Sequence, residues 1–294
     1  MPTALRRLLL LTPTLAVIGV FMLAPLGLMA YVSFLERGLN GGVVWGSHTA
    51  DAYLQFLFIR DLDDSLLLNT DYIRIFLRSI GLALTTMLLA LLVGFPTALY
   101  MALQPARYRN LLVFMVTIPF WTNLLVRNYA WILLLRNGGL IDSGLDRLGL
   151  GEGPLDLLYT PFAIGVGLTY SFLPFMVLPI YASLEKLDFR LVEAAFDLGA
   201  DRRRALTRII IPLARPGIIA GCILVFIPCL GAYVTPELLG GSKSLMIGNL
   251  IQNQFGAARN WPFGSALAFV LLALVLIAMT LYSLRLRRDP ARGG

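Results

Sequence analysis

The residue types that most often perform catalysis or hold metal ions are scarce in this sequence. His48 is the only histidine, so the chain offers neither a His/Cys cluster for zinc nor a Ser/His/Asp triad. Cys222 and Cys229 are seven residues apart in an apolar stretch, which places them on one helix face and favours packing over a disulfide. We therefore expect no metal site, no cofactor bound by this chain and no enzymatic activity of its own.

Polar and aromatic residues inside long apolar stretches are the remaining candidates for contact with a solute. Arg127 would cost about 2.5 to 3.5 kcal/mol if it faced lipid, so we expect it to face protein, water or the outer interface. A structural arginine paired with a carbonyl or carboxylate is an alternative. Aromatic rings attract cations, although they fit packing or an interfacial aromatic belt equally well. The candidates for a solute pathway are Trp121, Asn123, Arg127, Tyr170, Tyr233 and Glu237.

The segment from residue 191 to residue 213 has a spacing that predicts a helix for binding a partner. We expect a short helix through Glu193, a stop at Gly199, and a second helix that begins at about Asp201 and ends near Pro212. Alanines beside Glu193 let another surface approach closely, and a glycine allows the turn. The alternative is an amphipathic helix that touches lipid headgroups through a basic face. That face would comprise Arg202, Arg203, Arg204 and Arg208.

The elements that position these residues are predicted to be membrane-spanning helices. Of the 294 residues, 58% are hydrophobic and 14% are charged, whereas soluble domains have about 25% charged residues. A hydrocarbon core about 30 Å thick needs about 20 apolar helical residues, because lipid cannot satisfy backbone polar groups. The stretches that pass this length test are 8–35, 79–103, 111–135, 162–184, 217–238 and 264–284. We predict an all-α integral membrane protein with six transmembrane helices in one domain over residues 1–294.

The distribution of Lys and Arg predicts the orientation of these helices. With a cytoplasmic N-terminus, 15 of the 24 basic residues fall on the inner side, so both termini are expected to be cytoplasmic. Residues 36–78 then form a periplasmic loop, and residues 185–216 form a cytoplasmic loop. The outer loop is either a docking surface or a solvated loop with a short helix near residues 50–59. This placement also explains the net charge of +7, so nucleic-acid binding is not expected.

The cytoplasmic segment resembles the coupling loop of permease subunits from binding-protein-dependent ABC importers. The family pattern is Glu-Ala-Ala, three residues, Gly, nine residues, Ile, one residue, Leu-Pro. Ile211 replaces the leucine, an apolar exchange that leaves the pattern intact. The matching residues are Glu193, Ala194, Ala195, Gly199, Ile209 and Pro212.

This resemblance implies a type I ABC importer permease fold and a multi-pass position in the bacterial inner membrane. In this family the helix before the glycine couples a separate ATPase to the membrane helices. The implied coupling residues are Glu193, Ala194, Ala195, Asp197, Gly199, Ile209 and Pro212. The chain has no Gly-Lys pair for a phosphate-binding loop, so ATP and Mg are expected at the ATPase. The implied partners are a second homologous permease subunit, two ATPase subunits, a periplasmic substrate-binding protein and membrane lipid.

Further segments are similar to the first permease of spermidine/putrescine importers, namely residues 119–131, 235–241, 246–251 and 261–264. The resemblance implies import of polyamines by alternating access. Ala232 stands where polyamine permeases usually have an acidic residue, which removes a partner for an ammonium group. Import of an opine, an aminophosphonate or a related solute therefore stays open. A channel or an intramembrane enzyme is the alternative from a different class.

Overall fold

The computed structural model describes residues 3–60, 66–148, 156–241 and 244–288, and almost all regular structure in them is helical. The chain divides into two compact units. One comprises residues 1–74 and 250–294, and the other comprises residues 75–249. The single transmembrane domain over residues 1–294 stays a prediction.

The first unit contains two long apolar helices and the outer loop. Its elements are α1 (Thr3–Val32), β1 (Glu36–Arg37), β2 (Val43–Val44), α2 (Asp51–Leu54), β3 (Phe58–Arg60), β4 (Leu66–Leu68) and α13 (Trp261–Arg288). Helix α1 contacts α13, and Arg37 Nη2 donates to the carbonyl of Ala258 at 2.8 Å.

The outer loop is more ordered than the sequence predicts. Strands β1 and β2 pair antiparallel with Glu36 opposite Val44, and β3 and β4 pair antiparallel with Phe58 opposite Leu68. The helix predicted near residues 50–59 is only α2, because the chain becomes extended at β3. Residues 61–65 of this loop lie outside the described residues.

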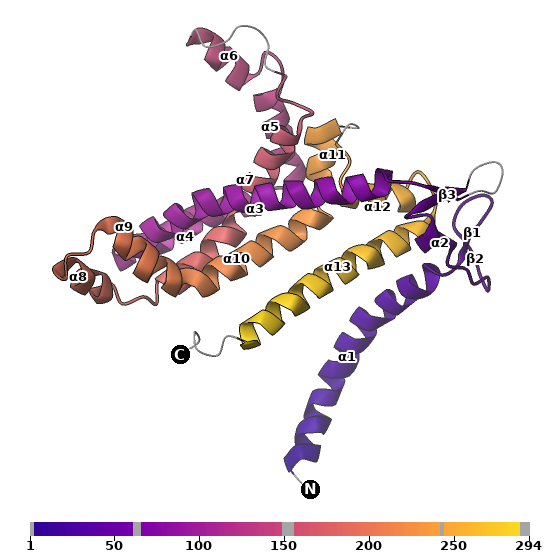
Figure 1. Cartoon of the computed structure of the whole chain (residues 1–294), viewed down its shortest axis with the longest axis horizontal. Coiled ribbons are helices and arrows are strands. Elements are labelled where there is room, and N and C mark those ends of the chain that lie inside the picture. The colour runs from indigo at the N-terminus through magenta and orange to yellow at the C-terminus, as the bar shows by residue number, and fades with distance from the viewer. Residues whose placement is uncertain (1–2, 61–65, 149–155, 242–243, 289–294) are drawn as a thin grey trace. The chain divides into compact units, whose positions relative to one another are not determined.

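The second unit is built on helices α7 and α10, which lie side by side (Figure 1). Its elements are α3 (Asp71–Leu103), α4 (Ala106–Trp121), α5 (Leu124–Leu135), α6 (Leu140–Arg147), α7 (Pro161–Leu184), α8 (Arg190–Asp197), α9 (Arg202–Ala205), η1 (Leu206–Ile210), α10 (Ile211–Gly231), α11 (Val234–Gly240) and α12 (Ile247–Phe255). Helices α3 and α12 begin or end across the division between the units. The most extensive helix contact joins α7 and α10, and the buried core includes Met176, Ile180 and Ala214.

Small residues on α10 allow α7 and α10 to approach each other closely. A Cβ atom at Gly221 would lie 2.8 Å from Met176 Sδ, and one at Gly217 would collide with the carbonyl oxygen of Pro179. Helix association in lipid depends on van der Waals packing, which small residues four positions apart make closer. Gly217 and Gly221 therefore set the distance between α7 and α10.

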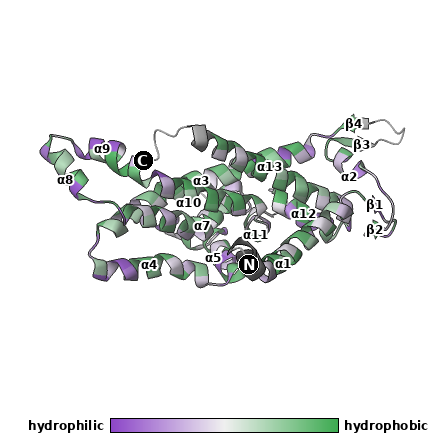
Figure 2. Ribbon diagram, turned by 90° about the horizontal axis from the view of Figure 1, so that it is seen from below, coloured by the Kyte–Doolittle hydropathy of each residue, from purple (hydrophilic) through white to green (hydrophobic). Residues whose placement is uncertain are grey.

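Within the part of the chain that the structure describes, five helices are long and apolar enough to cross a membrane, and the count reaches six if one bent pair is a single span. Figure 2 shows hydrophobic residues along much of α3, α7, α10 and α13, and hydrophilic residues over α8 and α9. The five regions are Leu11–Val32, Asp71–Leu103, Pro161–Leu184, Arg202–Gly231 and Trp261–Leu281. The predicted stretch over residues 79–103 therefore begins earlier, at Asp71.

The prediction of one continuous helix over residues 111–135 is wrong. The chain bends by 88° between α4 and the segment that begins at Leu124. Thr122 is extended, with φ −74° and ψ 146°, and the Asn123 side chain accepts a hydrogen bond from the Leu125 N–H at 2.8 Å. Pro119 also removes one backbone donor from the last turn of α4. An asparagine cap thus starts a new helix inside the apolar stretch.

Two further helix boundaries differ from the sequence prediction. The second helix of the coupling loop does not end near Pro212 but continues from α9 through η1 into α10. Helix α10 ends at Gly231 instead of residue 238, because Ala232 is extended, with ψ 133°, and α11 begins at Val234. Pro212 lies in the first turn of α10, where its missing N–H is tolerated next to the wider π-turn of η1.

Candidate functional site

The α8–α9 loop ends its first helix with a complete capping motif. Gly199 adopts φ +82°, its N–H donates to the carbonyl of Phe196 at 2.9 Å, and the Ala200 N–H donates to the carbonyl of Ala195 at 2.9 Å. These two bonds define a Schellman motif, in which the left-handed residue is usually glycine. The structure thus confirms the helix stop that the sequence predicts at Gly199.

The second helix of the loop begins with its own cap. Asp201 Oδ1 accepts a hydrogen bond from the Arg204 N–H at 2.7 Å, which satisfies one of the free donors of the first turn. Ala205 and Ile210 are buried in the same hydrophobic cluster as Met176 and Ile180 of α7. Any displacement of the loop therefore acts directly on the packed membrane helices.

The outward side of the loop is available to a partner. Glu193, Ala194 and Asp197 are exposed, and Leu198 has 89% of its surface exposed. Of the other proposed coupling residues, Ala195 and Ile209 are partly buried, whereas Gly199 and Pro212 are exposed. An exposed leucine between an acidic residue and a glycine is the kind of contact that a partner's groove covers.

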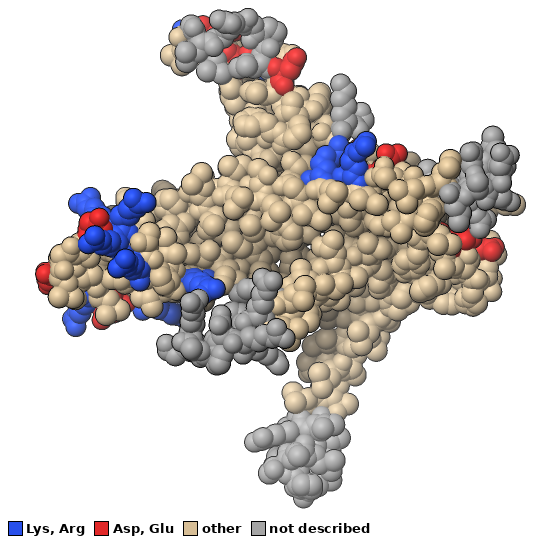
Figure 3. Space-filling model, in the orientation of Figure 1, with Lys and Arg blue, Asp and Glu red and all other residues tan. Residues whose placement is uncertain are grey.

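Basic residues gather around this loop. Figure 3 shows Lys and Arg over the α8–α9 end of the second unit, with acidic residues among them. The exposed arginines of the stretch are Arg202, Arg203, Arg204 and Arg208. Arg109 of α4 contacts both α3 and the end of α7. Its Nη2 donates to the Ala102 carbonyl at 2.9 Å, and its Nη1 lies 3.8 Å from Glu185 Oε1.

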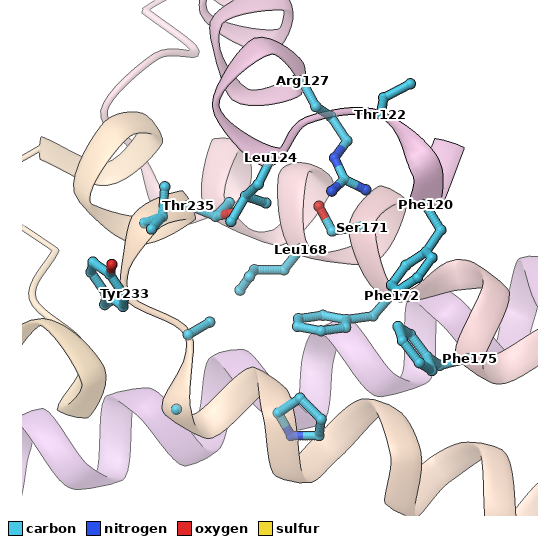
Figure 4. A pocket seen from close by; sticks show the side chains of 14 residues that line it. Phe120, Thr122, Leu124, Arg127, Leu168, Ser171, Phe172, Phe175, Tyr233 and Thr235 are labelled. Carbon is cyan, nitrogen blue, oxygen red and sulfur yellow. The ribbon is translucent and has the colours of Figure 1, made fainter. Parts of the chain in front are cut away.

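A cavity of about 450 Å³ lies within the second unit, where α4 ends and α5 begins. Its walls come from that break, from the middle of α7, and from the junction of α10 with α11 (Figure 4). Broken helices at mid-membrane depth are where secondary transporters build their solute sites. Leu168 and Phe175 belong to the middle of the α7 span, so the cavity lies at that depth along α7.

One wall of the cavity is aromatic. The rings of Phe120 and Phe175 meet edge to face with centroids 5.2 Å apart, and Phe172 and Phe175 are 6.2 Å apart. Tyr233 lies on the other side of the cavity in Figure 4. The negative faces of such rings attract cations, so this wall suits an alkylammonium group.

Another wall of the cavity is polar. Arg127 Nη1 donates to the carbonyl of Pro119 at 3.2 Å, across the break between α4 and α5, while its buried Nε has no hydrogen-bond partner among the described residues. The buried hydroxyl of Ser171 also lacks a partner there, and Figure 4 shows the guanidinium pointing toward it. Among the described residues, no Asp or Glu lines this cavity.

The structure brings only two of the six predicted pathway residues, Arg127 and Tyr233, to this cavity. The Trp121 side chain is 82% exposed at the end of α4, and Asn123 caps α5. Tyr170 packs edge to face on Trp131 at 5.7 Å.

Glu237 faces a different partner. It accepts a hydrogen bond from Asn249 Nδ2 at 2.7 Å, and the same Nδ2 donates to the carbonyl of Tyr233 at 2.9 Å. Glu237 is exposed and does not line the cavity, so the carboxylate serves to hold α12 near α11.

Several cavity residues were not predicted as part of a site, namely Phe120, Ser171, Phe172 and Phe175. On α7, Leu168, Phe172 and Phe175 recur at spacings of four and three, which marks one helix face. This periodicity is a signal that could have identified the wall. Ala232 lines the cavity too, so an acidic side chain at this position would lie in its wall.

The chain matches known proteins over most of its length. Residues 94–288 match the family described as binding-protein-dependent transport system inner membrane component. The spermidine/putrescine transport system permease protein PotB of Escherichia coli K12 is 42% identical over 256 residues, which cover 87% of this chain and 93% of PotB. The spermidine/putrescine transport system permease protein PotC of the same organism is 35% identical over 121 residues, which cover 41% of this chain and 45% of PotC.

A solved structure shares the fold. A chain in the crystal structure of a bacterial ABC transporter involved in the import of the acidic polysaccharide alginate matches 98% of this chain over 98% of its own length, with a TM-score of 0.68 and 17% identity. The family match covers the coupling loop, the broken helix and the cavity walls together. The chain therefore belongs to the binding-protein-dependent transport system inner membrane components, the permease subunits of ABC importers.

Proposed function

We propose that this chain forms one half of a heterodimeric pore in the bacterial inner membrane, with both termini in the cytoplasm, and imports polyamines such as spermidine or putrescine. The observation that carries this proposal is the 42% identity to PotB over 87% of the chain. The aromatic cavity wall adds a physical reason, because ring faces attract the ammonium groups of a polyamine.

The proposed complex contains a second homologous permease, two ATPase subunits and a periplasmic substrate-binding protein. A half-pore cannot enclose a path with alternating access by itself, and the similarity to PotC supports a related permease as the second half. ATP and Mg bind at the separate ATPase subunits. This sequence has no Gly-Lys pair and therefore no phosphate-binding loop of its own. The chain is a transport subunit and not an enzyme.

The coupling step uses the exposed loop. Closure of the ATPase pair on ATP moves α8, and the buried contacts of Ala205 and Ile210 pass this movement to α7 and α10. The cavity then opens outward to receive the solute from the docked binding protein, and resetting after hydrolysis releases the solute inward. Tighter binding of ATP to the closed ATPase state provides the bias between the two conformations.

A second candidate substrate is an amine that also carries an anionic group, such as an opine or an aminophosphonate. Arg127 favours it, because a guanidinium in the cavity attracts an oxyanion and repels a polyamine. Ala232 favours it too, because it leaves the cavity wall without the acidic residue that polyamine permeases usually have there.

Uptake by the reconstituted complex tests both candidates. Vesicles that contain this chain, its partner permease, the ATPase and the binding protein should accumulate labelled spermidine or putrescine only when ATP is present on the ATPase side. Accumulation of an aminophosphonate alone would identify the second candidate. Solute flux without ATP or without the ATPase would instead indicate a channel and would contradict the importer.

A further inference from the structure

The Ser171 side chain differs from several other hydroxyl side chains in the helices of this unit. Ser79 donates to the carbonyl of Ile75 at 2.8 Å, Thr97 to that of Val93 at 2.7 Å, and Thr117 to that of Val113 at 3.0 Å. These are bonds to the carbonyl four residues earlier, the usual partner of a helical hydroxyl. Ser171 is only 8% exposed, yet its Oγ makes no such bond within the described chain.

Arg127 is held in place but not neutralised. Its Nη1 bond to the Pro119 carbonyl fixes the guanidinium at the helix break, and its buried Nε has no partner among the described residues. Buried polar atoms almost always have a partner, and an unpartnered one calls for a water, an ion or a ligand. The two unpartnered groups line the same cavity, and Figure 4 shows one pointing toward the other.

A guanidinium beside a hydroxyl has the chemistry of an oxyanion site. Arginine presents several donors in a fixed plane that matches the two oxygens of a carboxylate, and a serine hydroxyl adds one more donor. An ammonium group offers only donors and carries the same charge as the guanidinium, so it gains nothing at this position. Thr86 and Thr169 also lack partners in the described chain but do not line the cavity.

We infer that Arg127 and Ser171 form a subsite for a carboxylate or a similar oxyanion on the polar wall of the cavity, facing the aromatic wall that suits an amine. The inference rests on the proposed function, in which the cavity belongs to the solute path. The oxyanion comes either from a solute that carries both an amine and an acid, or from an acidic side chain of the second permease.

Thiol labelling next to the guanidinium tests this subsite without knowledge of the natural solute. Leu124 lines the cavity, is 39% exposed and precedes Arg127 by three residues, so the two side chains are neighbours on α5. Leu124→Cys is made in a chain with Cys222→Ala and Cys229→Ala. The measured quantity is the ratio of labelling rates for an anionic and a cationic methanethiosulfonate of similar size.

The expected ratio favours the anionic reagent by at least about fivefold, because a nearby unpaired positive charge concentrates anions. Arg127→Gln should remove this preference. Arg136→Gln is the matched control, because it deletes one positive charge at the other end of α5 without touching the cavity. Equal rates for both reagents in the chain alone and also in the empty complex, or the same change from both Arg substitutions, would overturn the inference.

Two preparations identify the source of the oxyanion. If the anionic preference persists in the empty complex, and 4-aminobutyrate slows the anionic reagent while putrescine of similar length does not, the solute supplies the acid. Ser171→Ala should then weaken the protection by 4-aminobutyrate several-fold. If the preference appears in the chain alone and disappears on assembly with the second permease, that subunit supplies the acid.

No labelling in either preparation would also overturn the inference, because the guanidinium would then be closed to any ligand. A failure of this kind is distinct from a failure of the proposed function. Vesicle uptake driven by ATP can succeed while the labelling ratio shows no charge preference, and the reverse can also occur.

Discussion

The coupling loop and the cavity belong to the same compact unit, but they treat their polar groups differently. In the loop, Gly199, Ala200 and Asp201 take part in hydrogen bonds that close the ends of two helices, and the charged side chains face outward. In the cavity, Arg127 Nε and Ser171 Oγ are buried without partners within the described chain. The polar groups that end the helices of the loop are thus satisfied within the chain, whereas the cavity keeps two donors free, which agrees with the proposed roles of a protein contact and a ligand site.

The largest expected effect comes from reversing a charge on the outward side of the loop. Glu193→Arg should abolish solute-stimulated ATP hydrolysis by the assembled complex, because it places a cation where the ATPase meets an acidic residue. Expression and thermal stability should not change, since Glu193 is exposed. The measurement is ATP hydrolysis by the reconstituted complex with and without loaded binding protein.

Asp146→Arg is the control for this charge reversal. Asp146 is an exposed acid on α6, outside the loop, and its reversal should leave hydrolysis unchanged. Normal transport by the Glu193→Arg complex would show that α8 does not carry the coupling.

A smaller effect is expected on stability, where removal of the hydrogen-bonded Ser79 hydroxyl is compared with removal of the unpartnered Ser171 hydroxyl. Ser79 is fully buried, and its Oγ accepts a hydrogen bond from the Ile247 N–H at 2.9 Å. Ser79→Ala leaves that N–H buried without a partner, which should cost about 1 to 3 kcal/mol of unfolding free energy. Ser171→Ala loses no bond to the described chain and should change stability by less than about 0.5 kcal/mol.

Thermal unfolding of the two variants in the same detergent compares them directly. The Tm of Ser79→Ala should fall by more than that of Ser171→Ala. An equal loss for both would mean that Ser171 has a structural partner, and the contrast between loop and cavity would then disappear.

The smallest expected effect lies in the turn of the coupling loop. A Cβ at Gly199 would meet no atom within 4 Å, so Gly199→Ala adds only the backbone strain of φ +82°. This should cost about 1 kcal/mol and lower the coupling of ATP hydrolysis to uptake by a few-fold. Gly199→Asn should cost less, because asparagine tolerates the left-handed region better.

The ratio of solute imported to ATP hydrolysed is the measurement for this pair. If alanine and asparagine give the same ratio as glycine, the turn is not under strain in the assembled complex, and the loop is less rigid than its hydrogen bonds indicate.

Much of the coupling loop could be predicted from the sequence. The stop at Gly199 and the start near Asp201 follow from local rules, because a helix end is satisfied by residues within a few positions of it. The continuation of the helix through Pro212 could not be predicted from the sequence, because the π-turn before it depends on packing of Ala205 and Ile210 against the membrane core.

The cavity depended on the tertiary structure. In an almost wholly apolar helix such as α7 every face can be buried, so the sequence does not decide whether Tyr170 or Phe172 meets a cavity. The structure turns Tyr170 toward Trp131 and Phe172 toward the cavity. The 88° bend at Asn123 brings Arg127 to the same cavity. Local hydrogen bonds depend on neighbouring residues and can be predicted from them, but the meeting of α4, α5, α7, α10 and α11 around one cavity is decided only when these helices pack.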